Sequence, residues 1–191
     1  MLCKIDKESN TNNYGNIFYL LGEVYRLQNA FDEAKISFKN ALKHYRLAND
    51  IVGQICAYGQ LGIAYTHLNQ LNEAKASHQK ALKLVQLTNN IGVQGDIYYG
   101  LGFTYLELDE LNEAEASFQK ALELSKLSNV ILTQGNILHG LGRVHMKRLQ
   151  WQDAKRLFEN ALAIHKQAQS AAGQRNDQYY LNIVLSKMSQ A

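Results

Sequence analysis

Residues 101–124 read LGFTYLELDELNEAEASFQKALEL, and closely similar stretches begin at residues 21, 61 and 141. Each stretch opens with Leu-Gly and carries Ala-Leu twenty residues later, so the four copies stand forty residues apart. A fixed period between about 20 and 50 residues is typical of proteins built from stacked structural repeats. The sequence therefore predicts an array of similar units rather than one irregular domain.

The overall composition is that of a globular protein, with 46% apolar and 19% charged residues and no proline. Charges of both signs are interspersed at a net +3, so no stretch resembles a nucleic-acid-binding tail. The N-terminal residues lack the apolar core of a signal peptide, and no apolar run is long enough to span a membrane. We expect a cytoplasmic protein without nucleic-acid or membrane partners.

The first half of each copy has the pattern of an amphipathic helix. In the third copy, Tyr98, Leu101, Gly102 and Tyr105 recur at i, i+3, i+4 and i+7, which is one helix face. A glycine inside a helix costs roughly 1 kcal/mol, so we expect another backbone to approach closely there. The fourth copy has His145 at the last of these positions, and we expect it to be a core histidine.

The second half of each copy predicts a second helix. Ala34, Phe38 and Ala41 follow at i, i+4 and i+7 in the first copy. The alanines let the paired helices approach, and the phenylalanine fills the space between them. The second copy has His78 in place of this phenylalanine, which indicates either a purely structural histidine or a pH-sensitive weak point.

A short polar connection separates the two helices of each copy. Asn29, Asn69 and Asp109 occur there, and we expect them to be N-caps because a short side-chain oxygen can accept a free backbone N–H. Leu149 has this position in the fourth copy, where we expect a weaker or differently built turn.

These patterns divide the chain into copies 14–53, 54–93, 94–133 and 134–173. Residues 1–13 are either the remnant of a preceding helix or an N-terminal tail. Residues 174–191 repeat only a first helix, which indicates a C-terminal capping helix over the apolar face of the last copy. The residues expected to face inward from this cap are Tyr180, Leu181, Val184, Leu185 and Met188.

The spacing of aromatic, Leu-Gly, Tyr, Ala, Phe and Ala residues resembles the tetratricopeptide repeat over nearly all of residues 14–188. This resemblance implies an all-α fold, a right-handed α-solenoid or superhelix of antiparallel helix pairs. The period of forty residues exceeds the period of about thirty-four that is usual in that family. The proline that commonly ends the second helix in the family is absent. The chain is similar in this respect to Pins/LGN-type scaffolds, to kinesin light chains and, most of all, to the sensor arrays of NLR-like signalling NTPases.

The resemblance also implies a concave groove lined by the first helix of each pair. Residues on that face vary between copies whereas the packing face does not, which indicates that a partner determines them. Large apolar or aromatic groups on an open face mark interaction sites, and Tyr and Arg are favoured anchors. We expect Tyr99, Phe103, His139 and Arg143 to contribute most. The predicted groove residues are Asn16, Tyr19, Glu23, Ile63, Asp96, Tyr99, Phe103, Leu106, Asn136, His139, Arg143 and Met146.

No motif assembles a nucleophile with a base, and no histidine or cysteine spacing suggests a metal site or a cofactor. The sequence therefore predicts a non-catalytic module that binds a protein segment or peptide. An alternative is the sensor part of a larger NLR-like signalling ATPase, acting through intramolecular or oligomeric contacts. A phosphatase-like regulator is a third reading, and self-association through the N-terminal end is a separate option.

Overall fold

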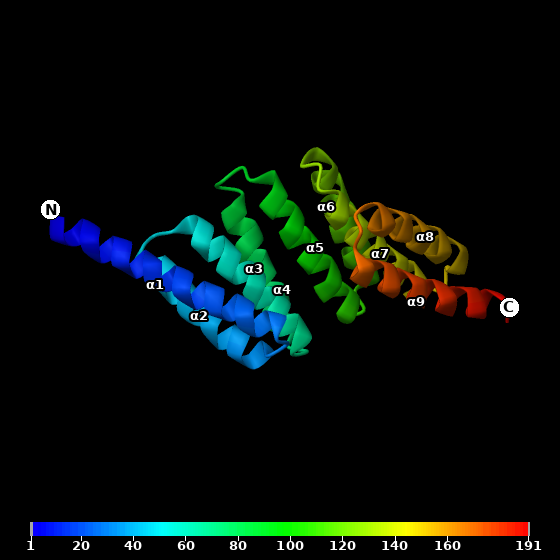
Figure 1. The fold of residues 1–191 in the computed structure, drawn as a ribbon, viewed down its shortest axis with the longest axis horizontal. Helices are drawn as coiled ribbons and strands as arrows, with labels where there is room; N and C mark the ends of the chain where they lie inside the picture. The colour runs from blue at the N-terminus through cyan, green and yellow to red at the C-terminus, as the bar shows by residue number, and fades with distance from the viewer. Residues whose placement is uncertain (1, 191) are drawn as a thin grey trace. The chain divides into compact units, whose positions relative to one another are not determined.

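A computed structural model describes residues 2–190, with side chains for residues 11–190. Within this range the chain forms nine helices and no strand (Figure 1). The chain divides into two compact units, of which unit 1 holds α1–α4 and unit 2 holds α5–α9. The helices are α1 (Leu2–Leu27), α2 (Phe31–Leu47), α3 (Ile51–His67), α4 (Leu71–Val85), α5 (Ile91–Glu107), α6 (Leu111–Leu127), α7 (Ile131–Lys147), α8 (Trp151–Gln167) and α9 (Ala171–Met188).

Each unit is a stack of helix pairs. In unit 1, α2 packs between α1 and α3, and α3 packs on α4. In unit 2, each helix from α5 to α8 packs on the next in sequence. The short connections make neighbouring helices antiparallel, so the all-α arrangement of helix pairs expected from the repeat is confirmed. No helix of the described residues is both long enough and apolar enough to cross a membrane.

Every connection contains one residue with a left-handed φ, and this is not the turn that the sequence predicts. Asn29, Asn69 and Asp109 have φ of 59°, 57° and 62°, in the left-handed region. They lie after the end of the preceding helix, and the N-cap residues Ala30, Gln70 and Glu110 make no side-chain cap bond. The N-cap prediction was wrong because asparagine and aspartate also tolerate left-handed backbone.

The turn itself closes the helix ends with backbone hydrogen bonds. The Ala30 N–H donates to the Tyr25 carbonyl at 2.9 Å, and the Asn29 N–H donates to the Arg26 carbonyl at 3.0 Å, a Schellman arrangement. Leu149 adopts the same turn with φ of 60°. The expectation of a differently built turn in the fourth copy was therefore wrong, whereas the expected weaker turn agrees with a leucine held in an unfavourable conformation.

A phenylalanine ring packs on a helical glycine in the first, third and fourth copies. A Cβ added to Gly22 would lie 2.5 Å from the Phe38 ring, and one added to Gly142 would lie 2.8 Å from Phe158. The sequence predicts an approaching backbone at these glycines, whereas the approaching group is the ring of the paired helix. The neighbouring alanines are fully buried, for example Ala154 on α8.

His78 occupies the phenylalanine position of the second copy and is 2% exposed. Neither ring nitrogen has a hydrogen-bond partner. The side chain therefore has a structural role, and its hydrogen-bonding capacity is unused. Burial lowers the pKa of His78 to about 4. Burial with a depressed pKa is what an acid-sensitive position requires.

The ends of the chain differ in detail from the expected boundaries. Helix α1 continues without a break from Leu2, so residues 2–13 belong to the first helix of the array. The later first helices begin near residues 51, 91, 131 and 171, about three residues before the expected boundaries. On α9, Leu181 and Val184 are buried and Tyr180 and Met188 pack beside them. Leu185 is 42% exposed, so its predicted inward position was wrong.

Candidate partner-binding site

A pocket of about 310 Å³ lies in unit 2 among α5, α7, α8 and α9. Most of its residues come from α5, α7 and α9, which are the first helices of their copies. We call it the polar pocket, because polar side chains form its floor and aromatic rings its wall. Its lining residues are Tyr99, Phe103, Asn136, His139, Arg143, His165, Gly173, Asn176, Asp177 and Tyr180.

A fully buried carboxylate joins three helices beneath the pocket. Asp177 on α9 is 0% exposed. Its Oδ1 lies 2.7 Å from Nδ1 of His139 on α7, and its Oδ2 lies 2.5 Å from Nδ1 of His165 on α8. A buried carboxylate is tolerated only when hydrogen bonds and charge partners replace water. The two imidazoles supply such partners, one to each oxygen, so Asp177 fixes both rings.

His165 fits between two glycines. A Cβ added to Gly135 on α7 would lie 2.8 Å from its Nε2, and one added to Gly173 on α9 would lie 2.5 Å from its Cγ. Its Nε2 also lies 3.0 Å from Oδ1 of Asn136. The ring therefore has both nitrogens engaged and both faces crowded, which locks its orientation.

Arg143 on α7 is the cation of the pocket. Its guanidinium carbon lies 5.6 Å from the centre of the Phe103 ring and 5.7 Å from that of Tyr180. Its Nη2 donates to Oε1 of Glu107 at 2.8 Å, which ties α7 to α5. Cation–π contacts and a carboxylate together hold the guanidinium in one orientation.

The aromatic wall is a set of edge-to-face rings. The centres of Tyr99 and Phe103 are 5.0 Å apart at 79°, and those of His139 and Tyr180 are 5.0 Å apart at 85°. Burial raises the pKa of Tyr99 to about 12, so its hydroxyl stays protonated and able to donate. Rigid aromatic rings with polar edges suit a surface that captures one or two side chains of a ligand.

The structure brings together five of the eight groove residues predicted in unit 2. These five are Tyr99, Phe103, Asn136, His139 and Arg143. Asp96 is not among the pocket residues; it is exposed, and desolvation of its carboxyl group raises its pKa. Met146 packs partly buried against the α8–α9 core instead of lining the pocket. Leu106 is 0% exposed and packs with Phe118 and its neighbours, so its predicted place on an open face was wrong.

The four remaining predicted residues lie in unit 1. Asn16 is exposed and accepts a 2.9 Å hydrogen bond from the Tyr45 hydroxyl. Tyr19 is half-buried, with its ring 5.6 Å from that of Phe38. Glu23 pairs with Arg26 at 2.9 Å, and Ile63 on α3 is half-buried. They form a separate set of partly exposed side chains in that unit.

Sequence reasoning missed His165, Asn176 and Asp177, and placed Tyr180 only in the cap. A signal was present at Asp177, since the residues forty, eighty and 120 positions earlier are Ile137, Ile97 and Ala57. A carboxylate in a register that is otherwise apolar predicts a buried polar partner. Its partners come from elements 12 and 38 residues away, which no local pattern identifies.

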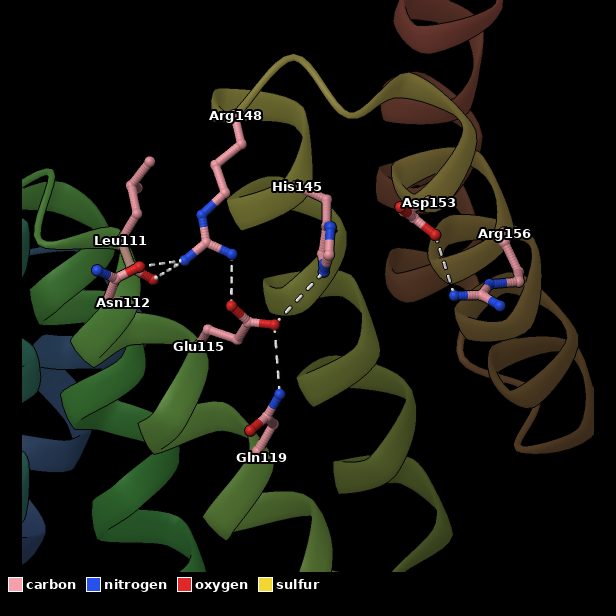
Figure 2. Close-up of polar contacts among 8 residues, drawn as sticks. All are labelled: Leu111, Asn112, Glu115, Gln119, His145, Arg148, Asp153 and Arg156. Atoms are coloured by element: carbon pink, nitrogen blue, oxygen red, sulfur yellow. Dashed lines mark hydrogen bonds and ion pairs between the residues drawn. The ribbon is translucent and has the colours of Figure 1, made fainter.

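A second polar cluster lies at the α6–α7 contact (Figure 2). Arg148, the C-cap residue directly after α7, pairs with Glu115 and donates to Oδ1 of Asn112 at 2.7 Å and to the Leu111 carbonyl at 3.2 Å. His145 lies half-buried with Nε2 3.7 Å from Oε1 of Glu115, so its predicted core position was wrong. This cluster joins two successive helices through side-chain contacts.

No three His, Cys, Asp or Glu side chains within residues 11–190 are arranged to hold a metal ion. The polar pocket therefore offers hydrogen bonds, one cation and aromatic rings. These are the means of recognising a ligand, and a nucleophile next to a general base is not among them.

Comparison with known sequences and structures agrees with this architecture. Profiles described as tetratricopeptide repeat match residues 15–43, 53–127 and 135–168. The comparison with curated proteins found no match.

Solved structures share the fold at low sequence identity. A Rap protein complexed with competence and sporulation factor aligns with a TM-score of 0.85 at 15% identity, over 93% of this chain and 50% of that protein. BtubC (BKLC) from P. vanneervenii aligns at 0.78 and 17% identity, over 94% and 74%. A Signal Transduction ATPase with Numerous Domains from Pyrococcus horikoshii, which has a tetratricopeptide repeat sensor, aligns at 0.77 and 15% identity, over 91% and 27%.

Proposed function

Because this chain belongs to the tetratricopeptide repeat family, we propose that it is a non-catalytic interaction module that binds a segment of a partner protein at the polar pocket. The observation that carries this proposal is the convergence of Tyr99, Phe103, His139, Arg143 and Tyr180 around one concavity. A side chain or chain end of the partner occupies the pocket, and the neighbouring surface of the first helices contacts its backbone. We further propose that Asn16, Tyr19, Glu23 and Ile63 contact the partner in unit 1.

The pocket is preorganised for this role. Asp177 holds His139, and the rings and Glu107 hold Arg143, so little side-chain entropy remains to be lost on binding. Asp177 engages Nδ1 of His139, so Nε2 is the ring nitrogen left for a ligand. It can therefore exchange a hydrogen bond with a ligand. At about 310 Å³ the pocket is at the small end of ligand sites, which suits one or two side chains.

A displayed library of random peptides, selected on the intact chain, provides a defined ligand for the test. The best peptide is then titrated calorimetrically into wild type, Phe103→Ala and Arg143→Ala. We expect each substitution to weaken binding by at least about tenfold, the typical loss at an anchor residue.

Arg148→Ala is the matched control. Arg148 has 22% side-chain exposure against 23% for Arg143, and each pairs with a glutamate on another helix. Thermal unfolding of each variant is measured so that affinities are compared only between folded proteins. Equal loss of binding in both arginine variants, or a selection that yields no saturable peptide, contradicts the proposal.

A second candidate function is a regulatory sensor within a larger signalling ATPase. It is favoured by the similarity to the Pyrococcus horikoshii protein, of which this chain spans 27%. This reading predicts further forty-residue copies and a GxxxxGK[ST] phosphate-binding motif in the coding sequence upstream of Met1. A stop codon directly upstream, without such sequence, contradicts it.

A further inference from the structure

A depression of about 490 Å³ lies along helix α2 in unit 1, and it carries positive charge. Its lining residues are Lys39, Leu42, Lys43, Arg46 and Leu47. The three cations recur at i, i+4 and i+7, so they form a row along one face of the helix. All three are exposed. We call this surface the basic depression.

Tyrosine rings of α3 hold the cations at the edge of the basic depression. Nζ of Lys39 lies 5.6 Å from the centre of the Tyr65 ring, and the guanidinium carbon of Arg46 lies 5.5 Å from that of Tyr58. Arg46 also donates a hydrogen bond to the Tyr58 hydroxyl. Nζ of Lys80 on α4 lies 5.7 Å from the centre of the same Tyr58 ring. These cation–π contacts gather charges of α2 and α4 over α3 without neutralising them.

No carboxylate among residues 11–190 forms an ion pair with the cations of this surface. Asp32, in the first turn of α2, pairs with Lys35 at 2.6 Å. Asp50, which follows α2, accepts a 2.9 Å hydrogen bond from the Gly53 N–H as the N-cap of α3. Like charges one helical turn apart repel each other. An anion from outside the unit would relieve this repulsion.

The second helices of unit 2 mix their charges at the same positions. The equivalent of Lys43 on α6 is Glu123, which pairs with Lys120 at 2.9 Å. The equivalent of Lys39 on α8 is Glu159. The packing of the repeat therefore does not require a row of cations, and the row on α2 needs another explanation.

We propose that the basic depression binds an acidic segment of a partner protein. The row from Lys39 to Arg46 spans about 10 Å along the helix axis, which matches about three to four residues of an extended chain. Leu47 lies at the end of the row and is 62% exposed, so it contacts one apolar side chain next to the carboxylates. The basic depression shares no residue with the polar pocket, so the inference stands independently of the proposed function.

The arrangement of the rings and cations favours peptide carboxylates over nucleic acid. Proteins that bind single strands offer free aromatic faces to the bases. Tyr58 is 7% exposed and lies beside two cations, and Lys39 lies over Tyr65. Phosphate is bound best by a free bidentate guanidinium, whereas Arg46 is already bonded to a tyrosine hydroxyl. The lysines are point charges, which suit carboxylates spaced along a peptide.

A second copy of this chain offers a poorer match. The densest acidic run of the sequence is 107–115. Its acids at positions 107, 109 and 115 already pair with Arg143, Lys147 and Arg148. A bilayer surface is also a poorer match, because a flat surface contacts protruding side chains better than side chains that line a depression. A separate acidic protein segment is therefore the occupant that the charges favour.

The test uses the intact chain and the fluorescent peptide Gly-Ser-Glu-Asp-Glu-Glu-Leu-Gly. In a second peptide, Gln and Asn replace the acidic residues. Anisotropy is measured near physiological ionic strength, about 0.15 M, with wild type, Lys43→Glu and Lys126→Glu. Lys126 is the matched control, because it is an exposed lysine on α6 and its substitution changes the net charge by the same amount.

The same three proteins are titrated with oligothymidylate and with vesicles of phosphatidylcholine and phosphatidylserine. Thermal unfolding of each variant is measured so that only folded proteins are compared. Sedimentation velocity measures their oligomeric state.

We expect saturable binding of the acidic peptide to wild type and Lys126→Glu, and at least about tenfold weaker binding to Lys43→Glu. The neutral peptide should bind wild type at least about tenfold more weakly than the acidic peptide does. No saturable binding, or equal weakening in both lysine variants, overturns the proposal. Tighter binding of the oligonucleotide or the vesicles that Lys43→Glu abolishes also overturns it, as does a wild-type dimer that Lys43→Glu converts to monomer.

Discussion

The first three helices of unit 1 and the last three of unit 2 are two versions of one frame. In unit 1, the Tyr45 ring lies between Gly15 and Gly53, and its hydroxyl donates to Asn16. In unit 2, His165 lies between Gly135 and Gly173 at the equivalent positions, and it bonds to Asn136.

The two versions differ in the residues buried next to the ring that lies between the two glycines, which is Tyr45 in unit 1 and His165 in unit 2. Position 57 is alanine and position 19 is tyrosine, whereas their counterparts are Asp177 and His139. Unit 1 thus closes an apolar contact where unit 2 closes a buried carboxylate with two imidazoles. Both units keep the two glycines and the ring between them. The different residues at positions 57 and 19 of unit 1, compared with 177 and 139 of unit 2, change this arrangement from apolar packing into a polar site.

The largest expected effect comes from breaking the buried carboxylate. Asp177→Ala leaves His139 and His165 without their partner and should cost about 3–5 kcal/mol of unfolding free energy, measured by urea unfolding. Adding His139→Tyr and His165→Tyr reproduces the unit 1 set and should restore most of that loss. A triple variant no more stable than the single one would show that the two frames are not interchangeable.

A second comparison concerns the core ring, which is Phe38 in the first copy and His78 in the second. Burial lowers the pKa of His78 to about 4 from an ordinary 6.5. The unfolded chain therefore binds the proton more readily, and stability falls as pH drops from about 6.5 towards 4, by about 3 kcal/mol in full. His78→Phe should remove this dependence, and Phe38→His should introduce another. The measurement is urea unfolding as a function of pH, and a His78→Phe variant that keeps the acid-induced loss contradicts the assignment.

Substitutions at two other helical glycines, Gly142 and Gly59, should have smaller effects of predictable sign. Gly142→Ala places a Cβ 2.8 Å from Phe158 and should destabilise by about 1–3 kcal/mol, despite the better helix propensity of alanine. Gly59→Ala on α3 meets nothing within 4 Å and should stabilise by about 0.5–1 kcal/mol. Thermal unfolding should move the two melting temperatures in opposite directions, and a shared direction would refute the packing explanation.

The smallest expected change in stability concerns the turns after α1 and α7. Asn29 and Leu149 have φ of 59° and 60°, but only asparagine tolerates this region well. Leu149 is 67% exposed, so it contributes little packing. Leu149→Asn should stabilise the chain by about 1 kcal/mol in chemical unfolding. The reverse change, Asn29→Leu, should destabilise by a similar amount, and two neutral substitutions would exclude strain at this turn.

Much of the fold was predictable because each position of the repeat occurs in four copies, which shows which residue types recur there. The helix pairs and the cap residues Leu181 and Val184 follow from that register, whereas the rings that approach the helical glycines do not. Side-chain oxygens suit both an N-cap and a left-handed turn, so composition alone did not place Asn29 correctly.

The polar pocket was predictable only in part. Helical periodicity placed Tyr99, Phe103, His139 and Arg143 on one side. The same geometry misplaced Leu106, because the helix that buries it lies elsewhere in the sequence. The contribution of His165 depends on how α7, α8 and α9 cross, which no single helix pattern contains.

The most direct test of the polar pocket as the partner-binding site is NMR of the isotope-labelled protein. The backbone amide shifts caused by the selected peptide are mapped onto the structure. We predict that the largest backbone amide shifts occur at Tyr99, Phe103, His139 and Asn176, and that they disappear in Arg143→Ala. Shifts centred on the α6–α7 contact near Asn112 and Glu115, with the pocket residues unchanged, would contradict the account.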